Sequence, residues 1–227
     1  MKKYILSLMA LASLAFTGCT DIESEGLTSF TIYPVITVLG DNPAVVVIGS
    51  NYADAGCKAD LGGEDVTSSV ITKNGVDANA FGTYYVNYTA YNSDGFMAAA
   101  KRTVYVCNPG KIDNIYMSSV SYGTRAYSNI PVIISDNGDG TYSIDDLCGG
   151  FYWGGLYPGY EPTYDFHCEG VITVDAEKGA QIVSVGKFYF SAVPSYGAST
   201  YDPESGIITI NLDGDFDGMK IVLNPVH

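Results

Sequence analysis

Hydrophobic residues recur with a period of two from Ile32 onward, and this alternation limits the possible folds more than any other feature of the chain. Successive side chains of a strand point to opposite faces, so this period is typical of strands that bury one face. In residues 83–90 one face would carry Tyr84, Val86, Tyr88 and Ala90. The opposite face would carry Thr83, Tyr85, Asn87 and Thr89. No segment beyond residue 18 carries a helical stripe, so the sequence predicts an all-β protein.

Glycine, proline, asparagine and aspartate separate the predicted strands. Asn92-Ser93-Asp94-Gly95 predicts a tight turn between the strand at 83–90 and a strand at 102–106. Residues 136–140 predict another hairpin. Further strands are predicted at residues 35–39, 44–48, 130–134, 141–144, 171–174, 181–185, 188–193, 208–212 and 219–223. Asn108-Pro109-Gly110 interrupts the pattern, so we expect one β domain over residues 32–107 and a second over residues 111–227.

The first nineteen residues have the form of a lipoprotein leader. Lys2 and Lys3 precede an apolar run, Tyr4–Phe16, that is too short to span a bilayer as a stable helix. Small residues then lead to Cys19, and the segment is similar to a lipobox. We therefore expect a signal peptide at residues 1–18 and lipidation of Cys19, whose acyl chains would anchor the protein in the outer membrane. The alternative is an ordinary signal peptide with an incidental cysteine.

Residues 19–31 would form an acidic tether between the lipidated cysteine and the folded body. Asp21, Glu23 and Glu25 resemble the acidic surface-export signals of Bacteroides-type lipoproteins, although here they alternate with other residues. The resemblance implies exposure on the cell surface. Without residues 1–18, which contribute Lys2 and Lys3, the charge is 9 − 25 = −16. Such a surface repels phosphate backbones, so nucleic acid is not an expected partner.

Four cysteines remain after Cys19. Cys57–Cys107 and Cys148–Cys168 bridges would respect the two-domain division, and export would place the protein where disulfides persist. Four cysteines allow three pairings, however, and buried free thiols are nearly as strong an alternative. None of the spacings is CxxC, so we expect neither a zinc site nor any other metal or cofactor.

Residues 32–107 resemble bacterial immunoglobulin-like surface domains of the HYR-like kind. The blocks that carry the resemblance are Pro34–Gly40, Ala53–Ala59, Asp65–Val70, Gly82–Ala90 and Arg102–Val106. The family implies a β-sandwich with a spacer or adhesion role and no catalytic residues. Cys57 departs from the pattern, because a small residue is more typical at that position.

Residues 111–227 resemble the C-terminal domain, of unknown function, of Bacteroides-type surface lipoproteins that are often encoded beside Sus-type glycan-import systems. The resemblance depends on Gly140–Asp146, Gly149–Tyr152 and Tyr201–Gly206. It implies a neighbourhood more than an activity, and it makes glycan and Sus-type importer components candidate partners. The complete prediction is an immunoglobulin-like β-sandwich followed by a second antiparallel β-sandwich or barrel-like domain.

Residues 151–166 concentrate aromatic side chains among glycines and prolines, and they include the only tryptophan. Aromatic faces beside carboxylates suit sugar rings, which have apolar C–H faces and a rim of hydroxyls. The candidate ligand-binding residues are Tyr152, Trp153, Tyr157 and Tyr160. The carboxylates near them in sequence are Asp145, Asp146, Glu161 and Asp165. The alternative is that these rings cap one end of a β-sheet core.

Two further features of the sequence give little support to a metal site or to catalysis. Asp213–Gly218 begins like a calcium loop, but its twelfth position is Asn224 in place of glutamate, so a solvated hairpin turn is the better interpretation. His167 and His227 are the only histidines, and no nucleophile elbow, HExxH or phosphate-binding loop is present. We expect His167 to be a strand residue satisfied by hydrogen bonds, and we expect the protein not to be an enzyme.

The sequence therefore predicts a non-catalytic, lipid-anchored surface protein that binds or retains glycan for a Sus-type uptake system. The first alternative is a structural or adhesive module that binds a protein partner. A weak hydrolase ranks third, because paired carboxylates suffice for glycoside cleavage but occur in almost any acidic protein.

Overall fold

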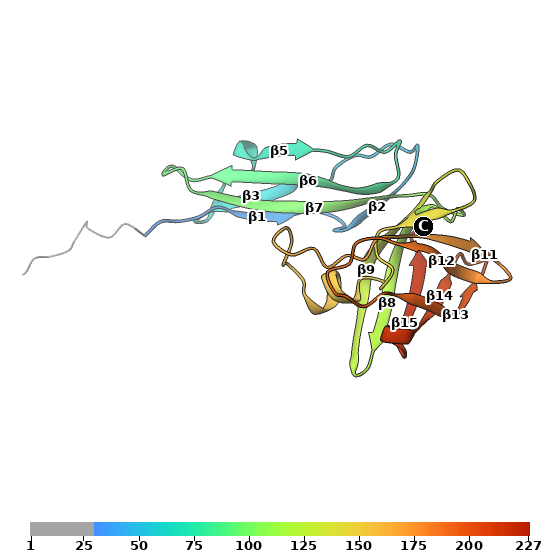
Figure 1. Cartoon of the computed structure of the whole chain (residues 1–227). Helices are drawn as coiled ribbons and strands as arrows, with labels where there is room; N and C mark the ends of the chain where they lie inside the picture. Colours follow the sequence, from blue (N-terminus) through green and yellow to red (C-terminus); the bar gives the residue numbers. More distant parts are fainter. Residues whose placement is uncertain (1–29) are drawn as a thin grey trace, which may run out of the picture.

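The computed structural model describes residues 30–227 and confirms the all-β prediction (Figure 1). Cys19, the predicted signal peptide and nearly all of the predicted tether lie outside the described residues. Between residues 30 and 227, no helix has the length and hydrophobicity needed to span a bilayer.

The N-terminal domain is a sandwich of two sheets with the strand orders β1-β3-β4 and β2-β7-β6-β5. Strand β2 pairs in parallel with β7, and the other pairs are antiparallel. The strands are β1 (Val35–Val38), β2 (Ala44–Val47), β3 (Cys57–Leu61), β4 (Glu64–Asp65), β5 (Ile71–Asn74), β6 (Gly82–Tyr91) and β7 (Met97–Cys107). A short 3₁₀ turn, η1 (Thr67–Ser69), follows β4. This is the predicted immunoglobulin-like sandwich.

Strand β6 follows the predicted alternation. Val86, Tyr88 and Ala90 are fully buried, and Val86 and Tyr88 pack with residues of β7 in the core of the sandwich. The turn that follows is held by Asn92, whose side-chain oxygen accepts the backbone N–H groups of Asp94 and Phe96. The period-two pattern and the turn signal thus predicted this hairpin correctly.

The C-terminal domain is a single antiparallel sheet of eight strands in the order β12-β11-β10-β9-β8-β15-β14-β13. The strands are β8 (Asn114–Tyr122), β9 (Arg125–Asp136), β10 (Tyr142–Ile144), β11 (Gly170–Asp175), β12 (Gly179–Val185), β13 (Ser195–Tyr201), β14 (Ile208–Asp213) and β15 (Lys220–Pro225). Two short helical turns, η2 (Phe151–Leu156) and η3 (Gly214–Phe216), complete it.

The two edge strands of this sheet meet, so the sheet curls into a nearly closed barrel. The backbone N–H of Ala180 in β12 donates to Oγ of Ser199 in β13 at 2.7 Å. Gly179 lies so close to Ser199 that a Cβ atom at position 179 would come within 2.5 Å of the backbone there. A side-chain hydrogen bond therefore closes the seam where a ladder of backbone bonds is missing, and the barrel-like form of the prediction is confirmed.

One segment differs from the prediction. Residues 188–193 form no strand, and the next strand begins at Ser195. The alternating Phe188 and Phe190 imitate a strand pattern, but both rings pack against Tyr152 at the end of the barrel. His167 likewise lies in irregular chain before β11, so its assignment to a strand was wrong.

Strand β7 of the N-terminal domain leads through residues 108–113 into β8 of the C-terminal domain (Figure 1). A small hydrophobic cluster lies at this connection. It contains Tyr105, Cys107, Ile115 and Val226. Asn114, which is fully buried, accepts the backbone N–H of Asn108 at 2.8 Å and donates to the carbonyl of Val226 at 3.0 Å. This side chain ties the connection between the domains to the end of the chain.

Candidate functional site

The loop between β10 and β11 begins with a turn held by the fully buried Asp146. Its two carboxylate oxygens accept the backbone N–H groups of Cys148 at 2.8 Å and Gly150 at 2.9 Å. Gly150 has a φ of +81°, and a Cβ atom there would lie 2.3 Å from Ile130 of β9. Glycine is required because the turn combines left-handed backbone with direct packing on the barrel.

The helical turn η2 continues this loop across β9 with π-type hydrogen bonds, Gly155 to Gly150 at 3.1 Å and Tyr157 to Tyr152 at 2.8 Å. A Cβ atom on Gly155 would lie 2.3 Å from the ring of Tyr127. The absence of a side chain at that position lets the wide turn lie directly on the barrel and directs the following residues outward.

Tyr152 and Trp153 do not form an open binding platform, because both side chains are partly buried. The ring of Tyr152 packs against Phe188, Phe190 and Phe216, with ring centroids 4.9–6.2 Å apart. Trp153 stacks on His167 at 4.5 Å, and its indole nitrogen is buried without a hydrogen-bond partner among the described residues. For these two residues the structure has the arrangement of the core-capping alternative.

Tyr157 and Tyr160 instead line a shallow hollow of about 340 Å³, which we call the tyrosine patch. The tyrosine patch consists of Tyr157, Tyr160, Tyr164, Phe166, Tyr189 and Phe190. Tyr160, Tyr164 and Tyr189 are 51%, 44% and 53% exposed. Phe166 lies between them, 4.8 Å from Tyr189 and 4.6 Å from Tyr157 between ring centroids. The patch thus has an apolar floor and several half-exposed rings that carry hydroxyl groups.

Sequence reasoning did not single out four members of this patch. Tyr164 and Phe166 lay within the aromatic stretch that it described, whereas Tyr189 and Phe190 lay in the segment expected to be a strand. The run Phe188-Tyr189-Phe190 was the available signal, because three consecutive rings cannot all face one side of a strand.

A polar rim borders the tyrosine patch. The Nδ1 atom of His167 lies 2.8 Å from Oε1 of Glu161 and 2.9 Å from Oδ1 of Asp165. The hydrogen bonds from the backbone and the ring of His167 lower the pKa of Asp165 below its ordinary value. Lys187 lines a second hollow of about 330 Å³, together with Asp165, His167 and Tyr189.

Glu161, Asp165 and His167 are the only group of three potential metal ligands that comes together within residues 30–227, with ligand atoms within 4.8 Å of one another. The carboxylates of Asp213–Gly218 form no such group, and residues 214–216 are the turn η3. The polar rim can offer a ligand on the tyrosine patch the carboxylate oxygens of Glu161 and Asp165 as hydrogen-bond acceptors, and the N–H groups of His167 and Lys187 as donors.

The other two carboxylates near this stretch serve the fold. Burial raises the pKa of Asp145 to about 6 and that of Asp146 to about 7. Asp145 accepts the backbone N–H of Ile133 at 2.9 Å, and Asp146 is sealed from solvent. A ligand on the tyrosine patch could not reach Asp146.

A larger hollow of about 480 Å³ lies over β9 to β12, but it is open and its lining contains no aromatic ring. Serines, glycines and aliphatic side chains make up most of this lining, together with Asp145 and Glu169. It offers no flat apolar face, so the tyrosine patch is the better candidate site in spite of its smaller volume.

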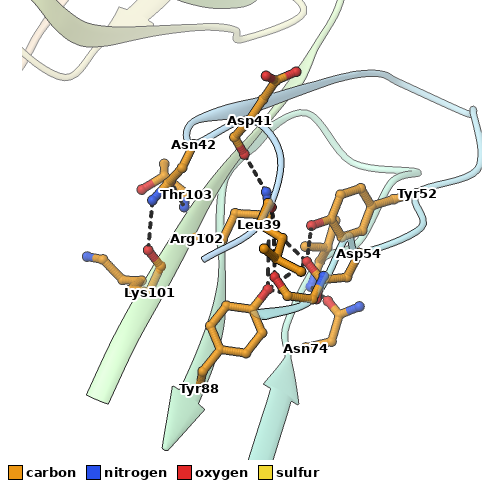
Figure 2. A network of polar contacts seen from close by, with 12 residues as sticks. Leu39, Asp41, Asn42, Tyr52, Asp54, Asn74, Tyr88, Lys101, Arg102 and Thr103 are labelled. Carbon is orange, nitrogen blue, oxygen red and sulfur yellow. Dashed lines mark hydrogen bonds and ion pairs between the residues drawn. The ribbon is translucent and has the colours of Figure 1, made fainter. Parts of the chain in front are cut away.

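The N-terminal domain contains a dense polar network centred on Arg102 (Figure 2). The guanidinium donates to Oδ1 of Asp54 and to the backbone carbonyls of Leu39, Asp41 and Gly56. The hydroxyls of Tyr52 and Tyr88 donate to the same carboxylate, at 3.0 and 2.7 Å. Its donors and acceptors pair within the domain, so the network fixes two loops of the sandwich and is not a ligand site.

All four described cysteines are free thiols in this structure. Cys57 is partly buried and packs against the core of the N-terminal sandwich, whereas Cys107 belongs to the cluster between the domains. The expected Cys57–Cys107 bridge is therefore not formed, and the reason is that the two residues pack in different clusters. Cys148 and Cys168 belong to one cluster, the core of the barrel.

Comparison with known proteins agrees with this architecture. Residues 36–106 match the family model described as "Bacterial surface protein, Ig-like domain". Residues 108–225, more than half of the chain, match a second family model, described as a C-terminal domain. No curated protein matches the sequence.

Solved structures also match, among them the crystal structure of the lipoprotein BT2262 from Bacteroides thetaiotaomicron. The TM-score is 0.60 at 24% sequence identity, and the match covers 85% of this chain and 100% of that one. At this identity the likeness shows a shared fold.

Proposed function

We propose that this chain is a non-catalytic surface lipoprotein whose tyrosine patch retains glycan. The chain belongs to the family whose model matches its C-terminal domain, and a bacterial surface Ig-like domain precedes that domain. The Ig-like domain would hold the patch away from the membrane, and acyl chains on Cys19 would anchor the protein in the outer membrane. Capture beside a Sus-type importer, on the outer face of that membrane, is part of the same proposal.

The observation that carries the proposal is the exposure of three tyrosine rings around one apolar floor. Tyr160 and Tyr164 come from the β10–β11 loop, and Tyr189 comes from the segment before β13. Grouped and half-exposed rings on an otherwise ordinary surface indicate a binding site more than scattered single residues do. Tyrosine offers both a flat apolar face for sugar C–H groups and a hydroxyl for the sugar rim.

The polar rim and the net charge narrow the class of glycan. Glu161 and Asp165 are well exposed, with side chains 49% and 73% accessible, and can accept hydrogen bonds from sugar hydroxyls. The predicted mature chain carries a charge of −16, which repels sulfated or uronic-acid-rich polymers. We therefore assign neutral polysaccharide as the ligand class.

The test is affinity electrophoresis in gels that contain neutral polysaccharides, with Tyr160→Ala/Tyr189→Ala as the binding variant. Each ring is expected to contribute about 0.5–1.5 kcal/mol, so losing both should weaken retention roughly tenfold. Tyr91→Ala is the matched control, because Tyr91 is a 49% exposed tyrosine of β6 in the other domain. Unchanged retention of the double variant, or no retention of the wild type by any neutral polysaccharide, would contradict the proposal.

The alternative function, adhesion to a protein partner, uses the same surface but predicts a different pattern of results. A partner recovered from outer membranes should then be lost with Tyr160→Ala/Tyr189→Ala, while polysaccharide gels retain no form of the protein. The anchoring proposal is tested separately by Cys19→Ala, which should move the protein from the membrane fraction to the soluble fraction.

A further inference from the structure

Cys148 and Cys168 lie at the two ends of the loop that carries most of the tyrosine patch. The backbone N–H of Leu147 donates to the carbonyl of Cys168 at 2.7 Å, so the outgoing and returning chains run side by side at this point. Both cysteines are fully buried, and both belong to the hydrophobic core of the barrel. Residues 149–167, which include most of the tyrosine patch, form the loop between them.

We propose that Cys148 and Cys168 form a disulfide when the protein is exported, and that this bridge fixes the base of the loop over residues 149–167. The structure then describes the dithiol form of the pair. Of the six single bridges that four cysteines could form, only this one joins residues that pack in one cluster. Cys57 and Cys107 have no such neighbour and remain thiols.

The reaction is a thiol–disulfide exchange with an exported dithiol oxidoreductase in its disulfide form. One cysteine thiolate attacks a sulfur of that disulfide, and a mixed disulfide forms as one sulfur of the oxidoreductase leaves. The second thiolate then displaces the oxidoreductase and completes the Cys148–Cys168 bond. The two cysteines lose two electrons and two protons, and the oxidoreductase is released as a dithiol.

This exchange has to take place while the domain folds. In the finished core both sulfurs are sealed from solvent, and the hydrogen bond to Cys168, together with burial, raises the pKa of the Cys148 thiol well above its ordinary value. The thiolate is the reacting species, so the buried pair is protected from exchange once the loop has closed.

The proposal is tested on the full-length protein isolated from membranes, denatured with an alkylating reagent in the absence of reductant. Trypsin leaves both cysteines on one peptide, because no lysine or arginine lies between Arg125 and Lys178. Chymotrypsin is therefore the suitable protease, since it cleaves after aromatic residues such as Tyr160 and Phe166. Mass spectrometry should find the Cys148 and Cys168 peptides linked, two hydrogens lighter than their sum, and separable by reductant.

Cys57 and Cys107 are internal controls, because both should carry the alkyl group before any reduction. Recovery of Cys148 and Cys168 as alkylated peptides from the unreduced sample would overturn the proposal. Its failure leaves the glycan proposal untouched, because this readout involves no ligand.

A thermal measurement gives a second, independent readout. A bridge across a loop of this size should make the Tm of the barrel roughly 5–10 °C lower in protein that was reduced in denaturant and refolded in reductant than in protein that was never reduced. The Cys57→Ser variant should keep this difference, because Cys57 takes no part in the bridge. Equal Tm values for the barrel before and after reduction in denaturant would count against the disulfide.

Discussion

The guanidinium Nε of Arg102 lies 2.8 Å from Oδ1 of Asp54 inside the N-terminal sandwich, and the Arg102 side chain is only 1% exposed (Figure 2). A buried cation of this kind is tolerated because each of its three nitrogens donates to an acceptor. Backbone carbonyls of Leu39, Asp41 and Gly56 supply the remaining partners. The Arg102 side chain thus joins β7 to the β1–β2 loop, which contains Leu39 and Asp41, and to the β2–β3 loop, which contains Asp54 and Gly56.

Replacing Arg102 should therefore destabilise the N-terminal domain far more than replacing its neighbour. Arg102→Met leaves the Asp54 carboxylate and three carbonyls without their donor, and we expect a loss of about 3–5 kcal/mol in the free energy of unfolding. Lys101→Met is the control, because Lys101 is exposed and only lies over the ring of Tyr85, which contributes about 1 kcal/mol or less. Urea unfolding measures both values, and equal losses would show that the network contributes little.

Acid should weaken the same domain through Asp54. Burial alone would raise the pKa of this carboxyl, but hydrogen bonds from Tyr88, Tyr52 and Arg102 outweigh burial and lower the pKa below its ordinary value. A lowered pKa stabilises the fold at pH values above the ordinary aspartate pKa of about 4, and the contribution disappears as the pH falls through the folded-state pKa. Stability measured between pH 5 and pH 2 should fall less steeply for Tyr88→Phe than for the wild type, because the substituted ring has no hydroxyl to donate to Asp54. An equally steep fall in both proteins would show that the tyrosine hydroxyl does not set this pKa.

The barrel should respond to pH in the opposite direction. Burial raises the pKa of Asp145 to about 6 and of Asp146 to about 7, so the folded state holds protons that the unfolded chain releases near pH 4. The stabilisation is complete below about pH 4 and is lost as the pH rises through the two folded-state pKa values. Between about pH 5 and 8 the barrel should lose on the order of 4 kcal/mol.

Asp146→Asn tests the residue behind this alkaline loss. The asparagine cannot ionise, so the free energy of unfolding should change less between about pH 5 and 8 than in the wild type. Asp139→Asn is the control, because Asp139 is exposed in the turn before β10 and its pKa is lowered by hydrogen bonds from Thr141. An unaltered slope in Asp146→Asn would assign the alkaline loss to another group.

Two glycines of the loop between β10 and β11 have the same backbone conformation and form a matched pair. Gly150 and Gly159 both have a φ of +81°, but a Cβ atom at 150 would lie 2.3 Å from Ile130, whereas no atom lies within 4 Å of one at 159. Gly159→Ala should cost about 1 kcal/mol for the left-handed backbone alone. Gly150→Ala should cost roughly 1–3 kcal/mol more, because β9 and the loop must move apart. Thermal unfolding compares the two, and similar Tm values would show that the contact with Ile130 yields easily.

Residue patterns predicted the local elements well. The alternation in residues 83–90 and 208–212 identified the buried faces of β6 and β14, and Asp-Gly turns marked the hairpins between strands. Aromatic enrichment after Cys148 located the loop that bears most of the tyrosine patch. These predictions succeed because strand alternation and turn chemistry depend on residues that are neighbours in sequence.

Contacts between distant segments were decided by the tertiary structure. The closing of the barrel brings Tyr189 and Phe190 beside Phe166, turns Tyr152 inward and buries Asp146 beneath the loop. The sequence by itself determined an all-β chain with an aromatic loop in its second half, because the alternation of residues within each strand specifies which face is buried. Only the fold decided which rings share a surface and which cysteines meet, because those relations depend on which strands pair across the barrel.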